Sequence, residues 1–549
     1  MDAASKKPDG ARAGLPILVK AQWRERLALS HAAEVALVWG SAAFASLVYL
    51  FRKGQDINWD QLNYHIYSVY SLINNRAELD IIPSQLQTWT NPFGNLLPYF
   101  LIRNMSPTIA SAILAVTAAL AVPLVYFLTK NILNRIESLS NLSRVIISSG
   151  AAIGAFFAPT FLSEVGTSLN DYIGNIFLLL ALLAVVKRRF DGPSYLLAGA
   201  LIGIAVDIKL TNAFFIAGWI VATIAIEKKQ FIVPLFCSGI GSLASYIPIG
   251  GAWNIYVYDL FKNPVFPLYN NIFKSDSYSH VAMLDTRFKP QSFASALEYF
   301  PRWALGDPAT AEVFFRDTRF LIALVVLVLA SARVVEAFFM PEEDRRRQVF
   351  ELKPSLFVLF FTIGSFVAWL TLFGIERYAI LLEQLAPLTI LILLSLLCES
   401  RRTFMLAATT TIVAILATTH AANWGRVSFG KDWYAVKMPE QLQGNDIMFV
   451  MLSIEPTSYI IPSFPKSDAF IRIEGNMPLT PKDGLGQEAV RRFHSHQGEL
   501  RTLAPAIYDL KQAENSLSSF GLEARSDNCL DIETKAGNLR SCPLMRRAP

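Results

Sequence analysis

Residues 56–95 read DINWDQLNYHIYSVYSLINNRAELDIIPSQLQTWTNPFGN, a polar, aromatic and acidic segment between the first long apolar run and the next. Asp60, Asn63, Tyr64 and His65 follow one another closely in it. On an α-helix, Asp60, Asn63 and Tyr64 would share a face, because positions i, i+3 and i+4 do, and His65 would lie to one side. The segment is either a solvated loop with an interfacial aromatic belt or a cluster of functional groups beside a bilayer.

Long apolar runs fill most of the rest of the chain. The 549 residues are 53% hydrophobic and only 17% charged, whereas soluble domains carry about 25% charged residues. A helix needs about 20 residues to cross about 30 Å of hydrocarbon, and Leu, Ile, Val and Ala in runs of this length predict helices rather than barrel strands. Eleven runs predict eleven spans: 35–51, 104–129, 145–163, 172–186, 192–206, 210–226, 230–258, 320–332, 354–375, 384–398 and 403–425. The runs 192–206 and 210–226 could instead form one re-entrant hairpin.

The distribution of Lys and Arg predicts the orientation. With the N-terminus in the cytoplasm, the inside segments hold 21 Lys and Arg, and the short outside segments hold 6. Cytoplasmic segments of membrane proteins carry this excess of positive charge. The net charge of +5 therefore reflects topology and gives no reason to expect a nucleic-acid partner.

The same reasoning divides the chain into three parts. We expect a basic cytoplasmic lead over 1–33, a transmembrane domain over 34–425, and a periplasmic soluble domain over 426–549. Two long outside loops, 52–103 and 259–319, interrupt the transmembrane domain. Both loops are aromatic, and we expect them to lie on the headgroups as interfacial helices, 59–75 being the helix of the first loop.

The soluble domain is predicted to be a small α+β unit. Residues 487–515 are expected to be helical. Cys529 and Cys542 bracket a short hairpin, and outside the cell they could form a disulfide. Three short apolar segments between turn residues predict strands, namely DIMFVML (446–452), TSYIIPSF (457–464) and AFIRIEG (469–475). We find no Walker loop, no dinucleotide fingerprint, no nucleophile elbow and no structural zinc pattern.

Further ionisable residues lie in the other outside segments. Glu164 and Asp171 belong to SEVGTSLNDY (163–172), which contains no Lys or Arg. Asp171 could cap the following helix and could also have a second role. Lys209 lies two residues after Asp207 at an outside turn, where it could pair with that carboxylate or bind a phosphate.

Arg377 is the one cation of its outside segment and precedes Tyr378. Its guanidinium has a fork of donors that fits phosphate oxygens. The alternative is a salt bridge to Glu376 or Glu383.

Taken together, these short motifs resemble the GT-C superfamily of polytopic glycosyltransferases over about residues 35–400. The first outside loop has Asp60-Gln-Leu-Asn-Tyr-His65, with Thr90-Asn91-Pro92 nearby, and the third and fourth runs are joined by a segment with Glu164 and Asp171. A turn from Gly203 to Thr211 contains Lys209, and Arg377-Tyr378 lies in a late outside segment.

The resemblance implies an all-α bundle that moves a sugar from a polyprenyl-phosphate carrier to a lipid, glycan or protein acceptor. It implies an inverting displacement in which a carboxylate base activates the acceptor hydroxyl. Asp60 would be this base, with Asp171 as a second catalytic residue and Asp56 and Glu164 as secondary candidates. Asn63, Tyr64, His65, Lys209, Arg377 and Tyr378 would bind substrate.

The cofactor and the class of protein are left with alternatives. The first loop has both Asp56 and Asp60 but no D-x-D pair, so no cofactor is assigned and a divalent metal is possible. A transporter or lipid flippase would need ionisable residues inside the spans, and a scaffold would have no use for Asp60. The chain ends without an endoplasmic reticulum retention signal, so we expect a bacterial inner membrane rather than the endoplasmic reticulum.

Overall fold

The computed structural model describes residues 30–133, 139–307, 310–339, 349–444 and 446–547. Most of the basic lead expected over 1–33 lies outside these residues.

Each apolar run forms a helix or a pair of consecutive helices, as the sequence predicts. The helices of this part are α2 (His31–Lys53), α5 (Pro107–Ala119), α6 (Ala121–Ile132), α7 (Asn141–Phe156), α8 (Pro159–Glu164), α9 (Asp171–Lys187), α10 (Gly192–Ile208), α11 (Phe214–Glu227), α12 (Ile232–Tyr246), α13 (Ala252–Phe261), α16 (Arg319–Phe339), α18 (Leu352–Leu372), α19 (Ile380–Leu397) and α20 (Arg401–Thr418).

The chain is a multi-pass membrane protein. Six helical segments are long and apolar enough to cross a bilayer: His31–Lys53, Pro107–Ile132, Leu210–Gln230, Ile232–Phe261, Leu352–Leu372 and Glu376–Leu397. Two shorter apolar helices, Gly192–Ile208 and Arg319–Ser331, accompany them. The larger number of eleven spans stays a prediction. Because α10 packs along α9 and α12 while α11 packs along α18, the two are not the arms of one hairpin.

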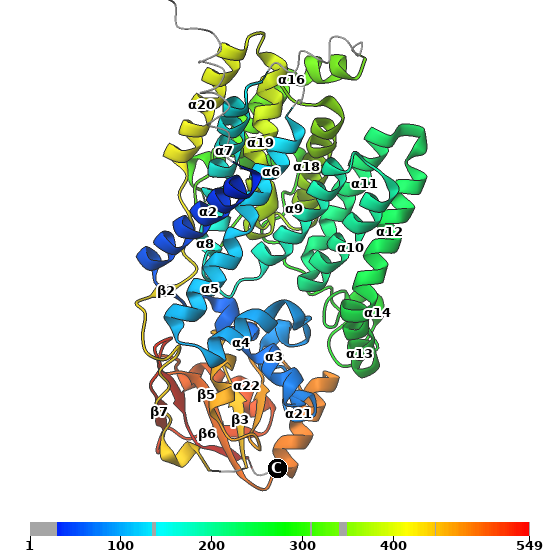
Figure 1. The fold of residues 1–549 in the computed structure, drawn as a ribbon. Coiled ribbons are helices and arrows are strands. Elements are labelled where there is room, and N and C mark those ends of the chain that lie inside the picture. Colours follow the sequence, from blue (N-terminus) through cyan, green and yellow to red (C-terminus); the bar gives the residue numbers. More distant parts are fainter. Residues whose placement is uncertain (1–29, 134–138, 308–309, 340–348, 445, 548–549) are drawn as a thin grey trace, which may run out of the picture.

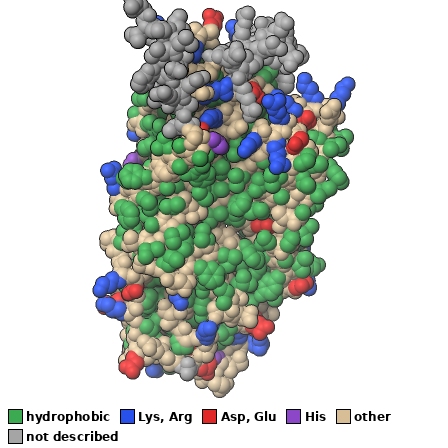
Figure 2. Space-filling model, viewed as in Figure 1, with side chains coloured by type: hydrophobic (Ala, Val, Ile, Leu, Met, Phe, Trp, Pro, Cys, Tyr) green, Lys and Arg blue, Asp and Glu red, His purple; other side chains and the backbone are tan. Residues whose placement is uncertain are grey.

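The helices form a bundle, and a second body containing the strands lies at one end of it (Figure 1). The face shown in Figure 2 has a broad apolar band over the bundle, with Lys and Arg side chains gathered beyond one edge of the band. A belt of this kind is what a lipid-facing surface requires. Helix α19 lies at the centre of the bundle, with fifteen of its residues buried in succession from Ile380 to Leu394.

The first long loop is not laid on a membrane surface, which corrects the expectation for 59–75. It forms the π-helix η1 (Gln61–His65), then α3 (Ile66–Ile73) and α4 (Leu96–Asn104). The apolar residues expected to face lipid, such as Ile66 and Val69, are buried in one cluster with Phe449 and Ile461 of the C-terminal domain. The C-terminal domain covers the face that the sequence alone leaves unpartnered.

The second long loop forms α14 (Asn270–Phe273) and α15 (Phe293–Leu305). Tyr299, Phe300 and Trp303 of α15 are buried against the bundle, while Phe293 and Leu305 are exposed. This separation of one buried and one exposed apolar side suits a helix at a bilayer interface, and its contact with headgroups stays a prediction.

The C-terminal domain contains a five-stranded mixed sheet of order β4-β3-β5-β8-β7. Its strands are β3 (Ile447–Met451), β4 (Ala469–Arg472), β5 (Glu499–Pro505), β7 (Leu530–Ile532) and β8 (Leu539–Ser541). Strands β6 (Leu522–Ala524) and β9 (Leu544–Arg546) form a separate pair, and α21 (Gly484–Ser495) and α22 (Glu514–Ser519) complete the domain. Strand β3 lies between β4 and β5, parallel to both. The disulfide Cys529–Cys542 closes the predicted hairpin.

Two predictions for this domain are wrong. Residues 457–464 form a 3-10 helix, Ser458–Ser463, rather than a strand, and Pro462 within it has no N–H to give to a sheet. The helix expected over 487–515 ends at Ser495, and Glu499–Pro505 is instead a strand. Pairing of β5 with β3 and β8 overrides the local helical pattern there.

Buried polar contacts attach the C-terminal domain to the first loop. Arg76 forms a salt bridge of 2.7 Å with Asp80 and donates hydrogen bonds to the carbonyls of Lys466 and Asp468. Asp80 also accepts a hydrogen bond of 2.9 Å from the Phe470 amide. The loop that holds Asp60 is therefore held between the bundle and the domain.

Candidate functional site

Four charged residues from four segments meet at the end of the bundle next to the C-terminal domain. Asp60 precedes η1, Asp171 begins α9, Lys209 follows α10, and Arg377 lies in the 3-10 turn η8 (Glu376–Ala379) before α19. We call Asp60, Asp171, Lys209 and Arg377 the site cluster.

The site cluster is a chain of ion pairs. The Arg377 guanidinium lies 2.7 Å from Asp60 and 3.8 Å from Asp171, and the Lys209 ammonium lies 2.6 Å from Asp171. The side chains of Lys209 and Arg377 are 13% and 17% exposed. Two negative and two positive charges balance each other at a largely buried position that water still reaches.

Burial alone would raise the pKa of Asp60, but the charge of Arg377 and, more weakly, that of Lys209 lower the pKa below its usual value. Asp60 is therefore ionised at neutral pH.

Aromatic rings enclose the two cations. Lys209 lies 4.8 Å from the centre of the Tyr378 ring, and Arg377 lies 5.5 Å from that of Trp424. The Tyr64 hydroxyl is 3.4 Å from Asp60. Tyr64 and Tyr378 are therefore at the site, as the sequence predicts. Trp424 was not predicted as a site residue, because it lies at the end of the last apolar run, far from the other motifs in the chain.

The structure decides between the alternatives that the sequence left open. Asp207 accepts a hydrogen bond from the Gly250 amide, and Lys209 pairs with Asp171 instead of with Asp207. Arg377 pairs with Asp60, and not with Glu376 or Glu383. Asp171 is the first residue of α9, and no side-chain capping bond is formed there.

The remaining candidates lie around the site cluster and have other partners. Glu164 is fully buried, and one of its oxygens accepts a hydrogen bond from the Tyr172 amide. Asn63 donates to the Ser84 carbonyl and the Gln87 side chain, so the structure joins it to the segment after α3 and not to the site cluster. Asp56 is surrounded by donors, and His65 contacts Ser168.

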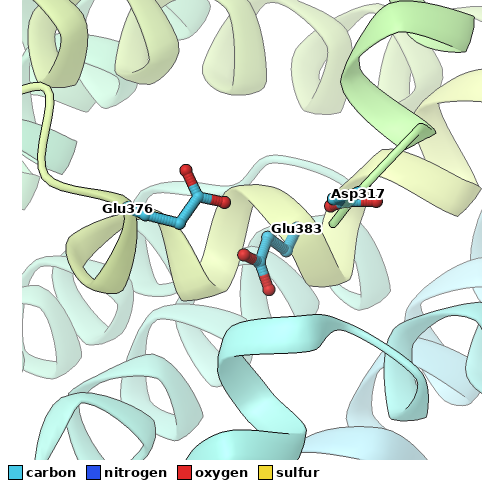
Figure 3. A group of neighbouring side chains, drawn as sticks. All are labelled: Asp317, Glu376 and Glu383. Carbon is cyan, nitrogen blue, oxygen red and sulfur yellow. The ribbon is translucent and has the colours of Figure 1, made fainter. Parts of the chain in front are cut away.

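A second group of three carboxylates gathers inside the bundle, one of them next to Arg377 in the chain (Figure 3). Oxygens of Asp317, Glu376 and Glu383 lie within 4.8 Å of one another, and all three residues are buried. We call these three residues the acid cluster. One buried cation, Arg319, lies 2.7 Å from Asp317. The sequence did not predict this group. Asp317 is distant in the chain from the two glutamates, and the sequence presented Glu376 and Glu383 only as possible partners of Arg377.

The acid cluster is the candidate metal site among the residues that the structure describes. However, Arg319 occupies one oxygen of Asp317, and Thr160 donates to both oxygens of Glu383. One oxygen each of Asp317 and Glu376 has no hydrogen-bond partner in the part of the chain that the structure describes. Because Mg²⁺ and Ca²⁺ take six or more oxygen ligands, the donor set fits a divalent ion poorly.

Comparisons with known proteins give structural likeness only. No protein-family model and no curated protein matches the chain. Over 93% of this chain and 98% of the other, its structure is similar to that of ArnT from Cupriavidus metallidurans bound to undecaprenyl phosphate, with 9% identity and a TM-score of 0.49. It is also similar to the Archaeoglobus fulgidus oligosaccharyltransferase tethered with an acceptor peptide, over 89% of this chain and 70% of that one, with 11% identity and a TM-score of 0.44.

Proposed function

We propose that this protein is a membrane glycosyltransferase that moves a sugar from a polyprenyl-phosphate carrier to a lipid, glycan or protein acceptor, with inversion at the anomeric carbon. The observation that carries the proposal is the site cluster. A carboxylate suited to act as base lies in contact with a guanidinium and close to an ammonium, at one end of a membrane bundle.

Lys209 and Arg377 are suited to bind the carrier phosphate. The Arg377 Nε–H is buried, lies 3.8 Å from Asp171 and has no hydrogen-bond acceptor among the described residues, so the protein leaves one donor of the guanidinium fork unsatisfied. Arginine binds phosphate oxygens through such forks, and charge-assisted hydrogen bonds of this kind are stronger than neutral ones. Both cations are partly exposed, so a ligand can reach them.

Asp60 is suited to act as the base. In the displacement, the acceptor hydroxyl oxygen forms a bond to the anomeric carbon and its proton passes to Asp60. The bond between that carbon and the phosphate oxygen breaks, and its electron pair leaves with the polyprenyl phosphate. Lys209 and Arg377 stabilise the negative charge that grows on the leaving phosphate.

Binding of the donor would also activate the base. Burial alone would raise the pKa of Asp60, and the positive charge of Arg377 lowers it against that effect. When the guanidinium turns toward a phosphate, Asp60 loses part of this stabilisation and becomes a stronger base. Asp171 holds Lys209 at 2.6 Å and would orient a hydroxyl of the sugar or the acceptor.

The divalent metal considered from the sequence has no assigned part in this reaction. If the acid cluster took an ion, Asp317 and Glu376 would supply their unpartnered oxygens. No step above depends on it, because Lys209 and Arg377 already supply positive charge at the phosphate.

The orientation belongs to the same proposal. We place the chain in a bacterial inner membrane with the N-terminus in the cytoplasm and the soluble domain in the periplasm. Outside the cytoplasm no nucleotide sugar is available, which suits a lipid-linked donor.

The test is transfer by Asp60→Asn in membranes supplied with undecaprenyl-phosphate-linked sugars. We expect loss of transfer with normal insertion and folding, since an amide cannot take the proton. Asp531→Asn, which changes an exposed carboxylate of the soluble domain, is the control and should transfer at the wild-type rate. Full transfer by Asp60→Asn removes Asp60 from the reaction. Solute movement without cleavage of any donor would favour a transporter.

A further inference from the structure

His65 is buried, and within the described residues only one of its ring nitrogens has a hydrogen-bond partner. Nδ1 lies 3.0 Å from the Ser168 hydroxyl. Nε2 is buried and has no hydrogen-bond partner among the described residues. Which nitrogen carries the proton therefore depends on what Ser168 does with its single hydroxyl hydrogen.

Asp56 decides the direction of that hydrogen. Its carboxylate accepts hydrogen bonds from the Asn58 amide and side chain, from Gln61 Nε2, and from the Ser168 amide at 2.8 Å. The Ser168 hydroxyl lies 3.0 Å from the same carboxylate. A carboxylate that accepts from these N–H donors has no hydrogen to give, and two oxygens 3.0 Å apart need a hydrogen between them, so Ser168 donates its hydrogen to Asp56.

The tautomer of His65 follows from this direction. Since Ser168 Oγ has given its hydrogen to Asp56, it can only accept from the imidazole, so Nδ1 carries the proton. Burial lowers the pKa of His65 to about 4, so the ring is neutral at physiological pH. Nε2 is then a lone-pair acceptor inside the protein, and it lacks a donor.

The local backbone brings His65 to the side of Asp60. In an α-helix, position i+5 would lie about 140° away from position i, at 3.6 residues per turn. Residues Gln61–His65 instead form a π-helix with wider turns, whose i→i+5 bonding brings positions i and i+5 closer in angle. The charges of all four members of the site cluster act on the ring.

We propose that Nε2 of His65 accepts a hydrogen bond from a hydroxyl group of the substrate, and that Ser168 and Asp56 are positioning residues that fix the ring and its tautomer. The inference rests on the proposed function, in which both the sugar and the acceptor carry hydroxyls. It gives Asp56 a role other than that of a base, because its oxygens are already occupied by protein donors.

The tautomer is measurable without any activity. ¹⁵N NMR of the full-length protein labelled at its six histidines, with His65→Asn to assign the signals, distinguishes a protonated from an unprotonated Nε2. We expect an unprotonated Nε2 in the wild type and a mixture of tautomers in Ser168→Ala. A protonated Nε2 in the wild type would overturn the inference.

The substrate contact is tested by adding undecaprenyl phosphate alone, undecaprenyl-phosphate-linked sugars, and then the acceptor. A shift of the Nε2 signal with the linked sugar, but not with the bare phosphate, assigns the sugar hydroxyl. A shift only after addition of the acceptor assigns the acceptor hydroxyl. An unmoved signal with every ligand that the protein binds would overturn the contact.

Two substitutions of His65 distinguish the contributions of Nδ1 and Nε2 to sugar transfer. Asn keeps a donor near the position of Nδ1 but has nothing at Nε2, whereas Gln places an amide near Nε2. We expect at least a tenfold loss for His65→Asn and a smaller loss for His65→Gln. His496→Asn, in the soluble domain, is the matched control and should be unchanged. Wild-type transfer by His65→Asn overturns this inference alone, whereas a wild type that transfers no sugar overturns the proposed function and the hydroxyl contact with it.

Discussion

The site cluster and the acid cluster contain similar residues and differ in charge balance. In the site cluster, two carboxylates face two cations that are partly exposed. In the acid cluster, three buried carboxylates face one buried guanidinium. Glu376 and Arg377 are neighbours in the chain, yet each belongs to a different cluster. The balanced cluster can exchange a carboxylate for a phosphate, whereas the unbalanced one must bind protons or a cation to remain buried.

The largest effect, a loss of folding stability, is expected from Arg319→Met, which removes the cation of the acid cluster. Arg319 pairs with Asp317 and donates to the carbonyls of Gly154, Phe157 and Glu383. Loss of one partner of a buried pair costs about 3–5 kcal/mol, so thermal unfolding of the detergent-solubilised protein should occur at a clearly lower temperature. Arg302→Met, which breaks the exposed pair with Asp307, is the control, and an equal effect of both would contradict the comparison.

Arg377→Met should mainly change catalysis. Removing one donor from a site that stabilises developing charge lowers kcat by about 10²- to 10³-fold. Arg377→Lys keeps the charge but loses the fork, and it should fall between the methionine variant and the wild type. Initial rates of sugar transfer at several donor concentrations measure this effect, and an unchanged kcat/KM for Arg377→Met would separate Arg377 from phosphate binding.

Glu376→Gln should change the free energy of unfolding in the opposite direction to Arg319→Met and by a smaller amount. Replacing one of three crowded carboxylates by an amide removes repulsion, so the free energy of unfolding should stay the same or rise by about 1 kcal/mol. Asp171→Asn in the balanced cluster, by contrast, leaves Lys209 without its partner and should be destabilising. If Glu376→Gln destabilises the protein as strongly as Arg319→Met, a bound cation balances the acid cluster.

The smallest effect concerns a buried carboxylate outside both clusters. Burial raises the pKa of Asp468 in the C-terminal domain to about 6, from an ordinary value of 3.8. A raised pKa in the fold means that stability is fully present below pH 4 and is lost as the pH rises through 6. The unfolding temperature of Asp468→Asn relative to the wild type should therefore be higher at pH 7 than at pH 4, and an equal difference at both would contradict this.

The sequence predicted the helices better than their surroundings. Apolar runs such as 354–375 became helices with nearly the predicted bounds, because hydrogen bonding within a segment needs no distant partner. The helix after Asp60 was also predicted, but not the domain that covers it. An apolar helix face indicates that the face is covered, but the same sequence pattern arises whether lipid or another part of the protein covers it.

The amino-acid sequence by itself determined the membrane-spanning character of this protein, the location of its polar segments between apolar runs, and the cysteine pair of its hairpin. These follow from composition and from local spacing. Only the tertiary structure decided that Lys209 pairs with Asp171 rather than Asp207, that Arg377 faces Asp60 rather than Glu376, and that Ser168 lies between Asp56 and His65. The physical reason is that an ion pair or a hydrogen bond depends on a few ångströms between atoms, and packing of helices distant in the chain sets those distances.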